Sequence, residues 1–112
     1  MNQPAMNERA IGEATRGGGL LVVAQWEAKE GQADTIAGIL RDFLPAAQSE
    51  PGVKLFLISR ATDDPAQFLF YELFRDEAAF KAHQESAHFK AHIAGQALPL
   101  LAKRERKQYA LM

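Results

Sequence analysis

The sequence predicts an α+β domain in which two helices pack on one face of a four-stranded antiparallel sheet. This fold class follows from the element order β-α-β-β-α-β, from one strongly amphipathic helical segment, and from a turn-rich hairpin near the middle of the chain. The 112 residues are enough for one hydrophobic core, and a chain of this size gains stability from a partner. We expect one domain, residues 20–112, preceded by a polar and flexible leader, residues 1–19.

The first strand and the first helix are separated by the short polar turn "KEGQ". Residues 20–28, "LLVVAQWEA", are rich in β-branched and aromatic side chains, which is typical of a strand. Between Gln32 and Gln48 the apolar residues recur with the 3.6-residue period of a helix. They are Ile36, Ile39, Leu40, Phe43, Leu44 and Ala47.

A β-hairpin is predicted next. Pro51 and Gly52 in "SEPGV" end the helix, because proline disfavours helical geometry in the residue before it and glycine can turn the chain. The apolar segments "VKLFLISRA" and "FLFYELF" flank "TDDPAQ", whose aspartates and proline are typical of a turn between antiparallel strands.

The last third of the chain contains the second helix and the last strand. Asp76 is the expected N-cap of a helix from Glu77, and Ser86 is a second cap where that helix breaks and restarts before ending near Pro99. "KRERKQYAL" then forms a fourth strand with a charged edge. This order, with both helices on one sheet face, is the ferredoxin-like plan.

Composition excludes several classes of function. Thirteen Lys and Arg against 14 Asp and Glu give no field that would attract nucleic acid or a membrane surface, so neither is an expected partner. Without cysteine there is no disulfide, thiolate zinc site or Cys nucleophile. No signal-peptide pattern, long apolar segment, phosphate-binding loop or dinucleotide fingerprint is present, so a cytoplasmic protein without nucleotide chemistry is expected.

Both faces of the predicted sheet are apolar. In "FLFYELF" the phenylalanines Phe68, Phe70 and Phe74 alternate with Leu69, Tyr71 and Leu73. Two helices cover one face only, so the other needs a partner. We expect a homodimer that packs sheet against sheet.

The three histidines of the chain, His83, His88 and His92, lie within ten residues. His88 and His92 are four residues apart, which is the spacing of two zinc ligands on one helix. However, no glutamate stands between them as in H-E-x-x-H, and His83 lies across the expected helix break. A metal site is not predicted, and hydrogen-bonded structural roles are favoured for His88 and His92.

His83 and Glu72 are the candidates for catalysis. His83 follows Phe80 by three residues, so it should point toward the sheet, where it would be either a general acid or base or a buried side chain with one hydrogen bond. Glu72 lies within an apolar strand, where it is either paired structurally or able to orient or deprotonate a substrate. Tyr71 and Trp26 combine polar atoms with apolar surface, as expected in a pocket for a flat aromatic ligand, but core residues share these properties.

The segment "FLFYELFRDEAAFKAHQESAHFKAHI" resembles the antibiotic biosynthesis monooxygenase domain family of dimeric α/β barrels, with an aromatic strand, a helix opening "RDEAAFKAH" and a restart at "SAHF". "KEGQADTI" and "SEPGV" are similar to the glycine turns of that family, and the resemblance covers Leu20 to Leu111.

The resemblance implies a ferredoxin-like protomer, a homodimer and a pocket between sheet and helices. It implies oxygenation of small aromatic quinols or phenols without metal, flavin or other cofactor, with His83 and Glu72 as catalytic candidates. Tyr71, Trp26, His88 and Phe89 are then the expected substrate-binding residues. Two alternatives stay open: a binding or stress-response module without turnover, and an isomerase resembling the enzyme of autoinducer-2 degradation. Basic pocket residues would favour a phosphorylated ligand, and a wholly apolar lining a quinol.

Overall fold

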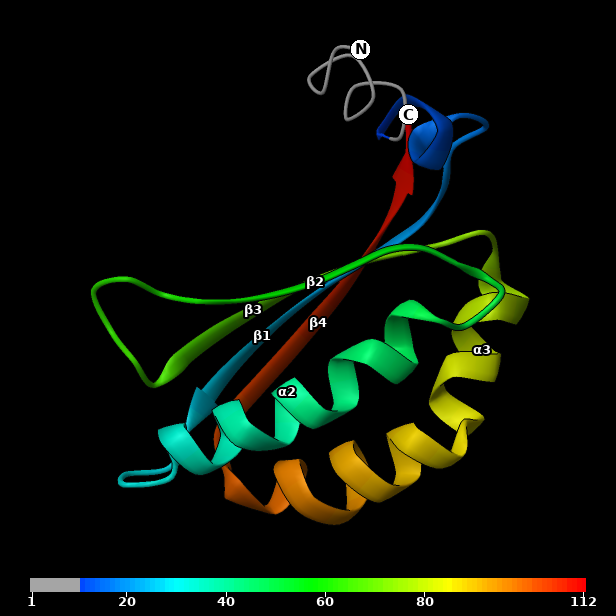
Figure 1. The fold of residues 1–112 in the computed structure, drawn as a ribbon. Helices are drawn as coiled ribbons and strands as arrows, with labels where there is room; N and C mark the ends of the chain where they lie inside the picture. Colours follow the sequence, from blue (N-terminus) through cyan, green and yellow to red (C-terminus); the bar gives the residue numbers. More distant parts are fainter. Residues whose placement is uncertain (1–10) are drawn as a thin grey trace, which may run out of the picture.

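The computed structural model describes residues 11–112, which contain the predicted elements in the predicted order (Figure 1). In chain order the elements are β1 (Gly19–Ala28), α2 (Ala33–Gln48), β2 (Val53–Arg60), β3 (Gln67–Phe74), α3 (Glu77–Glu85), the π-helix η1 (Phe89–Ala97), the 3-10 helix η2 (Leu98–Leu100) and β4 (Leu101–Leu111). Of the expected leader, residues 1–10 lie outside the described residues. No helix within residues 11–112 is both long and apolar enough to cross a membrane.

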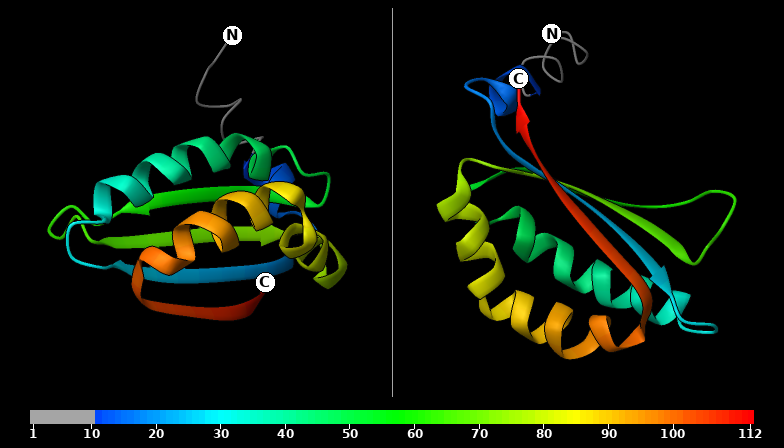
Figure 2. Two further views of the ribbon diagram at one scale, coloured as in Figure 1. Left: turned by 90° about the horizontal axis from the view of Figure 1, so that it is seen from below. Right: turned by 180° about the vertical axis from the view of Figure 1, so that it is seen from behind.

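The strands form one antiparallel sheet in the order β2-β3-β1-β4. Helices α2, α3 and η1 all lie on one face of this sheet, as two views of the ribbon show (Figures 1 and 2). This is the ferredoxin-like α+β arrangement, and the prediction of the fold class is confirmed.

The core lies between the sheet and the helices. Alternate residues of the two central strands point into it, among them Val22 and Trp26 of β1 and Phe70 of β3, each at most 3% exposed. From the other side α2 contributes Ile36 and Phe43 of its predicted stripe, both fully buried. The period-2 strands and the period-3.6 helix therefore meet on their apolar sides.

The predicted caps of the second helical region are present. The Asp76 carboxylate accepts a hydrogen bond from the Ala79 N–H (2.8 Å), and the Ser86 hydroxyl accepts one from the Phe89 N–H (3.2 Å). The restarted helix, η1, is a π-helix, which the sequence did not predict. The break at Ser86 turns the chain between α3 and η1, so both line the same side of the core.

No helix of the described residues covers the opposite face of the sheet (Figure 2). Leu57, Leu69 and Tyr109 on it are 53%, 41% and 43% exposed. The cross-strand register pairs Leu57 with Tyr71, which places Tyr71 on this face too. We call this the bare face.

Candidate functional site

A cavity lies between the sheet and the helices. Its volume is about 20 Å³, room for about one water molecule. Its walls are mostly aromatic, with a few charged groups. The lining residues are Ala24, Trp26, Phe43, Phe56, Phe70, Glu72, Phe80, His83, Phe89, Ile93, Arg104 and Arg106.

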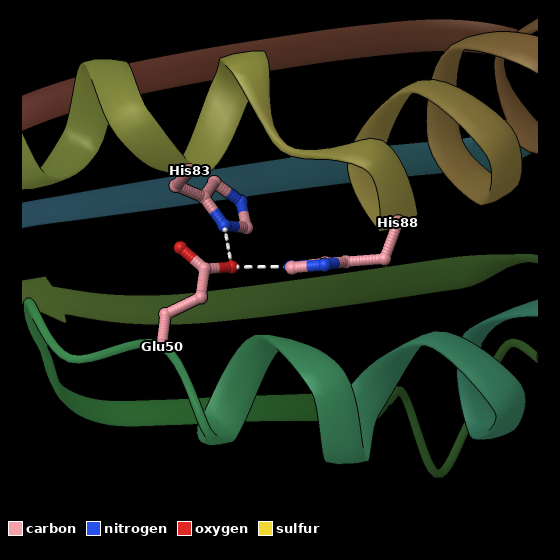
Figure 3. A group of neighbouring side chains, drawn as sticks. All are labelled: Glu50, His83 and His88. Atoms are coloured by element: carbon pink, nitrogen blue, oxygen red, sulfur yellow. Dashed lines mark hydrogen bonds and ion pairs between the residues drawn. The ribbon is translucent and has the colours of Figure 1, made fainter.

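Two histidines, of which His83 lines this cavity, converge on one carboxylate oxygen (Figure 3). The Glu50 Oε2 atom lies 2.7 Å from His83 Nδ1 and 2.6 Å from His88 Nε2. His83 comes from the last turn of α3, His88 from the residue before η1, and Glu50 from the loop between α2 and β2. Because a carboxylate oxygen only accepts, each imidazole donates an N–H to it.

The bond to Glu50 fixes the proton of His83. With Nδ1 as the donor, the neutral ring carries its lone pair on Nε2. That atom lies 3.9 Å from Glu72 Oε1, which is beyond hydrogen-bond distance. A hydroxyl oxygen beside the line joining these two atoms can lie at hydrogen-bond distance from both and so reach the His83 lone pair.

Burial lowers the pKa of His83 below its usual value, and the hydrogen bond and charge of Glu50 offset only part of this effect. The ring is 2% exposed and lies among Phe43, Phe56 and Phe74, with centroid separations of 5.2 to 5.9 Å. At neutral pH His83 is thus an uncharged base.

Glu72 is the second titratable group of the cavity. Burial raises its pKa to about 8 and Glu50 adds to the rise, although Arg106 and Arg104 act in the opposite direction. The side chain has no hydrogen bond to any other residue of 11–112. Near neutral pH it is mostly a protonated carboxyl group that can donate a hydrogen bond.

Arg104 and Arg106 supply the positive charge at the β4 side of the cavity. Neither guanidinium forms an ion pair or a hydrogen bond with a side chain described between residues 11 and 112. Burial, together with the neighbouring Arg106 charge, lowers the pKa of Arg104. The cavity therefore joins an aromatic wall, an uncharged base, a protonated carboxyl group and two cations.

Glu50, His83 and His88 could also offer ligands to a metal ion, since one ligand atom of each lies within 4.8 Å of the others. Around tetrahedral zinc, with bonds of about 2.1 Å, neighbouring ligand atoms are roughly 3.4 Å apart. The observed N···O distances of 2.6 and 2.7 Å are instead those of hydrogen bonds. The three side chains are arranged as two hydrogen-bond donors on one acceptor oxygen.

The structure separates the residues selected from the sequence. His83 is buried and points inward as predicted, and Glu72, Trp26 and Phe89 line the same cavity. His88 is hydrogen-bonded to Glu50, but unlike the other expected substrate-binding residues Trp26 and Phe89 it does not line the cavity. Tyr71 lies on the bare face and does not line the cavity.

His92 departs from the expected pattern. Its Nδ1 atom is buried and has no hydrogen-bond partner among residues 11–112. The histidines that converge are His83 and His88, five residues apart, and not the pair four residues apart. The turn at Ser86 makes this possible because it changes the direction of the helix between them.

Three functional residues were not selected from the sequence: Glu50, Arg104 and Arg106. Glu50 lies in the "SEPGV" loop, and only the packing of that loop against α3 brings it to His83. The arginines had a usable signal, because residues two apart in a strand share one face. What the sequence lacks is the register that places this face opposite Trp26 and Ala24.

Comparisons with known proteins identify the family and the fold. The family model described as antibiotic biosynthesis monooxygenase matches residues 19–95. The chain matches no curated protein.

Several solved structures have the same fold. PA3566 from Pseudomonas aeruginosa is 24% identical, with a TM-score of 0.79 and coverage of 86% of this chain and 96% of that one. SO0527 from Shewanella oneidensis is 26% identical, with a TM-score of 0.76 and coverage of 83% and 90%. A structure named antibiotic biosynthesis monooxygenase is 22% identical, with a TM-score of 0.72 and coverage of 83% and 96%.

Proposed function

Because the chain belongs to the antibiotic biosynthesis monooxygenase family, we propose that it oxygenates a small aromatic quinol or phenol with dioxygen, without a metal or an organic cofactor. The observation that carries this proposal is the position of His83. Its Nδ1 is bonded to Glu50 and its Nε2 faces an aromatic cavity.

The first step is removal of a proton from the substrate hydroxyl. His83 accepts it at Nε2, and Glu50 stabilises the resulting imidazolium through the bond at Nδ1. His88 donates to the same Glu50 oxygen and so holds the carboxylate in place. His88 is a positioning residue in this scheme.

Glu72 acts on the other side of the substrate oxygen. In its protonated form it donates a hydrogen bond, which stabilises the negative charge that develops when His83 takes the proton. Such a donor is needed because the site is shielded from water. Arg104 and Arg106 add positive charge at the cavity edge.

The substrate anion then reduces dioxygen. One oxygen atom forms a new C–O bond and the other leaves as water, so a quinol and dioxygen give a hydroxyquinone and water. The substrate supplies every electron that dioxygen accepts. The protein contributes deprotonation, charge stabilisation and a site shielded from bulk water.

An aromatic substrate needs more room than the cavity offers when closed. Trp26 and Phe70 form one wall, with ring centroids 4.5 Å apart, and Phe80 and Phe89 contribute from α3 and η1. In the proposed cycle α3 and η1 move apart at the Ser86 break to admit the ring. The irregular backbone between these helices suits such a movement.

The bare face forms the proposed homodimer interface. Its exposed leucines and Tyr109 form the continuous apolar surface that a second copy would cover sheet against sheet. The site of each protomer lies on the other face, so dimerisation leaves the cavity entrance uncovered by the partner sheet.

Oxygen uptake with reduced naphthoquinols and anthrones tests the activity. Wild type should exceed the autoxidation rate with at least one compound, and the product should contain one atom from labelled dioxygen. Uptake equal to autoxidation for every compound would instead favour a binding module without turnover.

A further inference from the structure

We propose that the substrate carries an anionic group, a carboxylate or a phosphate, and that Arg104 and Arg106 bind this group at the β4 edge of the cavity. The inference rests on the proposed function in taking this cavity as the substrate site. It adds a substrate class: hydroxylated aromatic rings with an acidic substituent at the end remote from the reacting hydroxyl.

The strand register gives the placement of the two arginines. Arg104 pairs with Trp26 and Arg106 with Ala24, so both lie on the sheet face that carries the cavity. β4 is the outermost strand on its side, next to β1. The guanidinium groups therefore stand at the rim, where a ligand group is accessible from solvent.

The charge balance of the cavity calls for an anion. Within residues 11–112 neither arginine has a side-chain ion-pair or hydrogen-bond partner, and Glu72, the carboxyl group whose charge acts on Arg104, is mostly protonated near neutral pH. Two adjacent cations repel each other, which costs free energy that a bound anion removes. Planar guanidinium groups match the geometry of carboxylate and phosphate oxygens.

The backbone positions of these polar groups are separated across the sheet. Glu72 is on β3 and the arginines are on β4, with β1 between them, which separates the two strands by about 10 Å. Trp26 on β1 and Phe70 on β3 line the same cavity, with their ring centroids 4.5 Å apart. A bicyclic ring lying on them would present its hydroxyl to His83 and its acidic group to the arginines.

Isothermal titration calorimetry with three compounds tests the inference: 6-hydroxy-2-naphthoate, 2-naphthol and 2-naphthyl phosphate. Wild type should bind at least one of the two anions about 10-fold or more tightly than 2-naphthol. The double variant Arg104→Gln/Arg106→Gln should lose this preference and keep its affinity for 2-naphthol within about 2-fold. The preferred anion identifies the group as carboxylate or phosphate.

A matched control carries the same change of charge elsewhere. Lys81 and Lys90 are exposed on α3 and η1 and do not line the cavity. The double variant Lys81→Gln/Lys90→Gln should keep the preference for the anion. Arg104→Lys/Arg106→Lys should keep part of it, since the charge stays but the planar geometry is lost.

Equal affinity of wild type for all three compounds, a preference that survives in the arginine-to-glutamine variant, or no binding of any compound would overturn the inference. Binding and turnover are measured separately. Oxygen uptake with neutral quinols, together with no preference for anions, would support the proposed monooxygenase function and overturn the inference about the anionic substrate. A preference for anions without oxygen uptake would keep the substrate class and remove the monooxygenase chemistry.

Discussion

The same strands build both faces of the sheet, and the two faces differ because successive residues of a strand point their side chains to opposite sides. The helix-covered face holds aromatic rings around His83 and Glu72, and Arg104 and Arg106 stand at its rim. The bare face holds leucines and tyrosines, partly exposed. Because strand residues alternate, a chain of this size can supply an internal site and an association surface from one sheet.

The largest effect should come from breaking the site on the covered face. His83→Ala removes the proposed base, and we expect the turnover rate in the oxygen-uptake assay to fall by about 10²–10⁴-fold. His88→Ala, which keeps the base and removes only its neighbour on Glu50, should cost less. Equal rates in wild type and His83→Ala, with both proteins folded by circular dichroism, would contradict the assignment.

Breaking the bare face should act on association and leave the covered face intact. A charge at Leu69, as in Leu69→Asp, should convert the proposed dimer to a monomer in light scattering at micromolar concentration. Gln25→Asp adds a charge at an exposed position of the same face where the side chain is already polar. This variant should therefore weaken association less than Leu69→Asp does. A monomeric wild type would remove the dimer proposal.

Glu72, on the covered face, should make the stability of the protein depend on pH. Its pKa is about 8 in the folded protein against an ordinary value of 4.5, so the folded state holds the extra proton between these values. The free energy of unfolding of the wild type should therefore fall as pH rises from about 5 to 8. The fall should be roughly 2–4 kcal/mol larger than in Glu72→Gln, which has no carboxyl group to titrate at this position. Urea unfolding at pH 5 and pH 8 measures this. Parallel pH profiles for the two proteins would argue against a buried, protonated carboxyl group.

The same carboxyl group should shape the activity. In the acid range, turnover should increase as the pH increases, because His83 loses its proton and becomes a base. Above about pH 8 turnover should decline, because Glu72 loses the proton that it donates. In Glu72→Gln the alkaline decline should disappear, since the amide keeps a donor. Oxygen-uptake rates from pH 5 to 9 decide this, and an unchanged alkaline decline would assign it to another group.

The smallest effect concerns the attachment of α3 to the sheet. A Cβ atom added at Gly52 would lie 2.3 Å from the Cβ of Ala79, so Gly52→Ala should destabilise the protein by about 1–3 kcal/mol. Gly38→Ala in α2 meets no atom within 4 Å and should be neutral or slightly stabilising. Thermal unfolding of both variants compares them, and equal midpoints would mean that the loop before β2 adjusts without cost.

The sequence by itself determined the order of elements, because strand and helix periods, caps and turn residues are local properties. The N-caps at Asp76 and Ser86 and the inward direction of His83 follow from such local spacing. The same alternation already separates Tyr71 from Glu72, since neighbouring residues of a strand face opposite sides. Tyr71 accordingly lies on the bare face, whereas Glu72 lines the cavity.

Only the tertiary structure decided which distant residues meet. Glu50 reaches His83 and His88 across 33 and 38 residues, and the register of β4 against β1 sets Arg104 beside Trp26. Neither contact has a local signal, because each depends on the rotation of a packed helix or the offset of a strand pair. The residues that carry the proposed chemistry were visible in the sequence one by one, and their combination arose from packing.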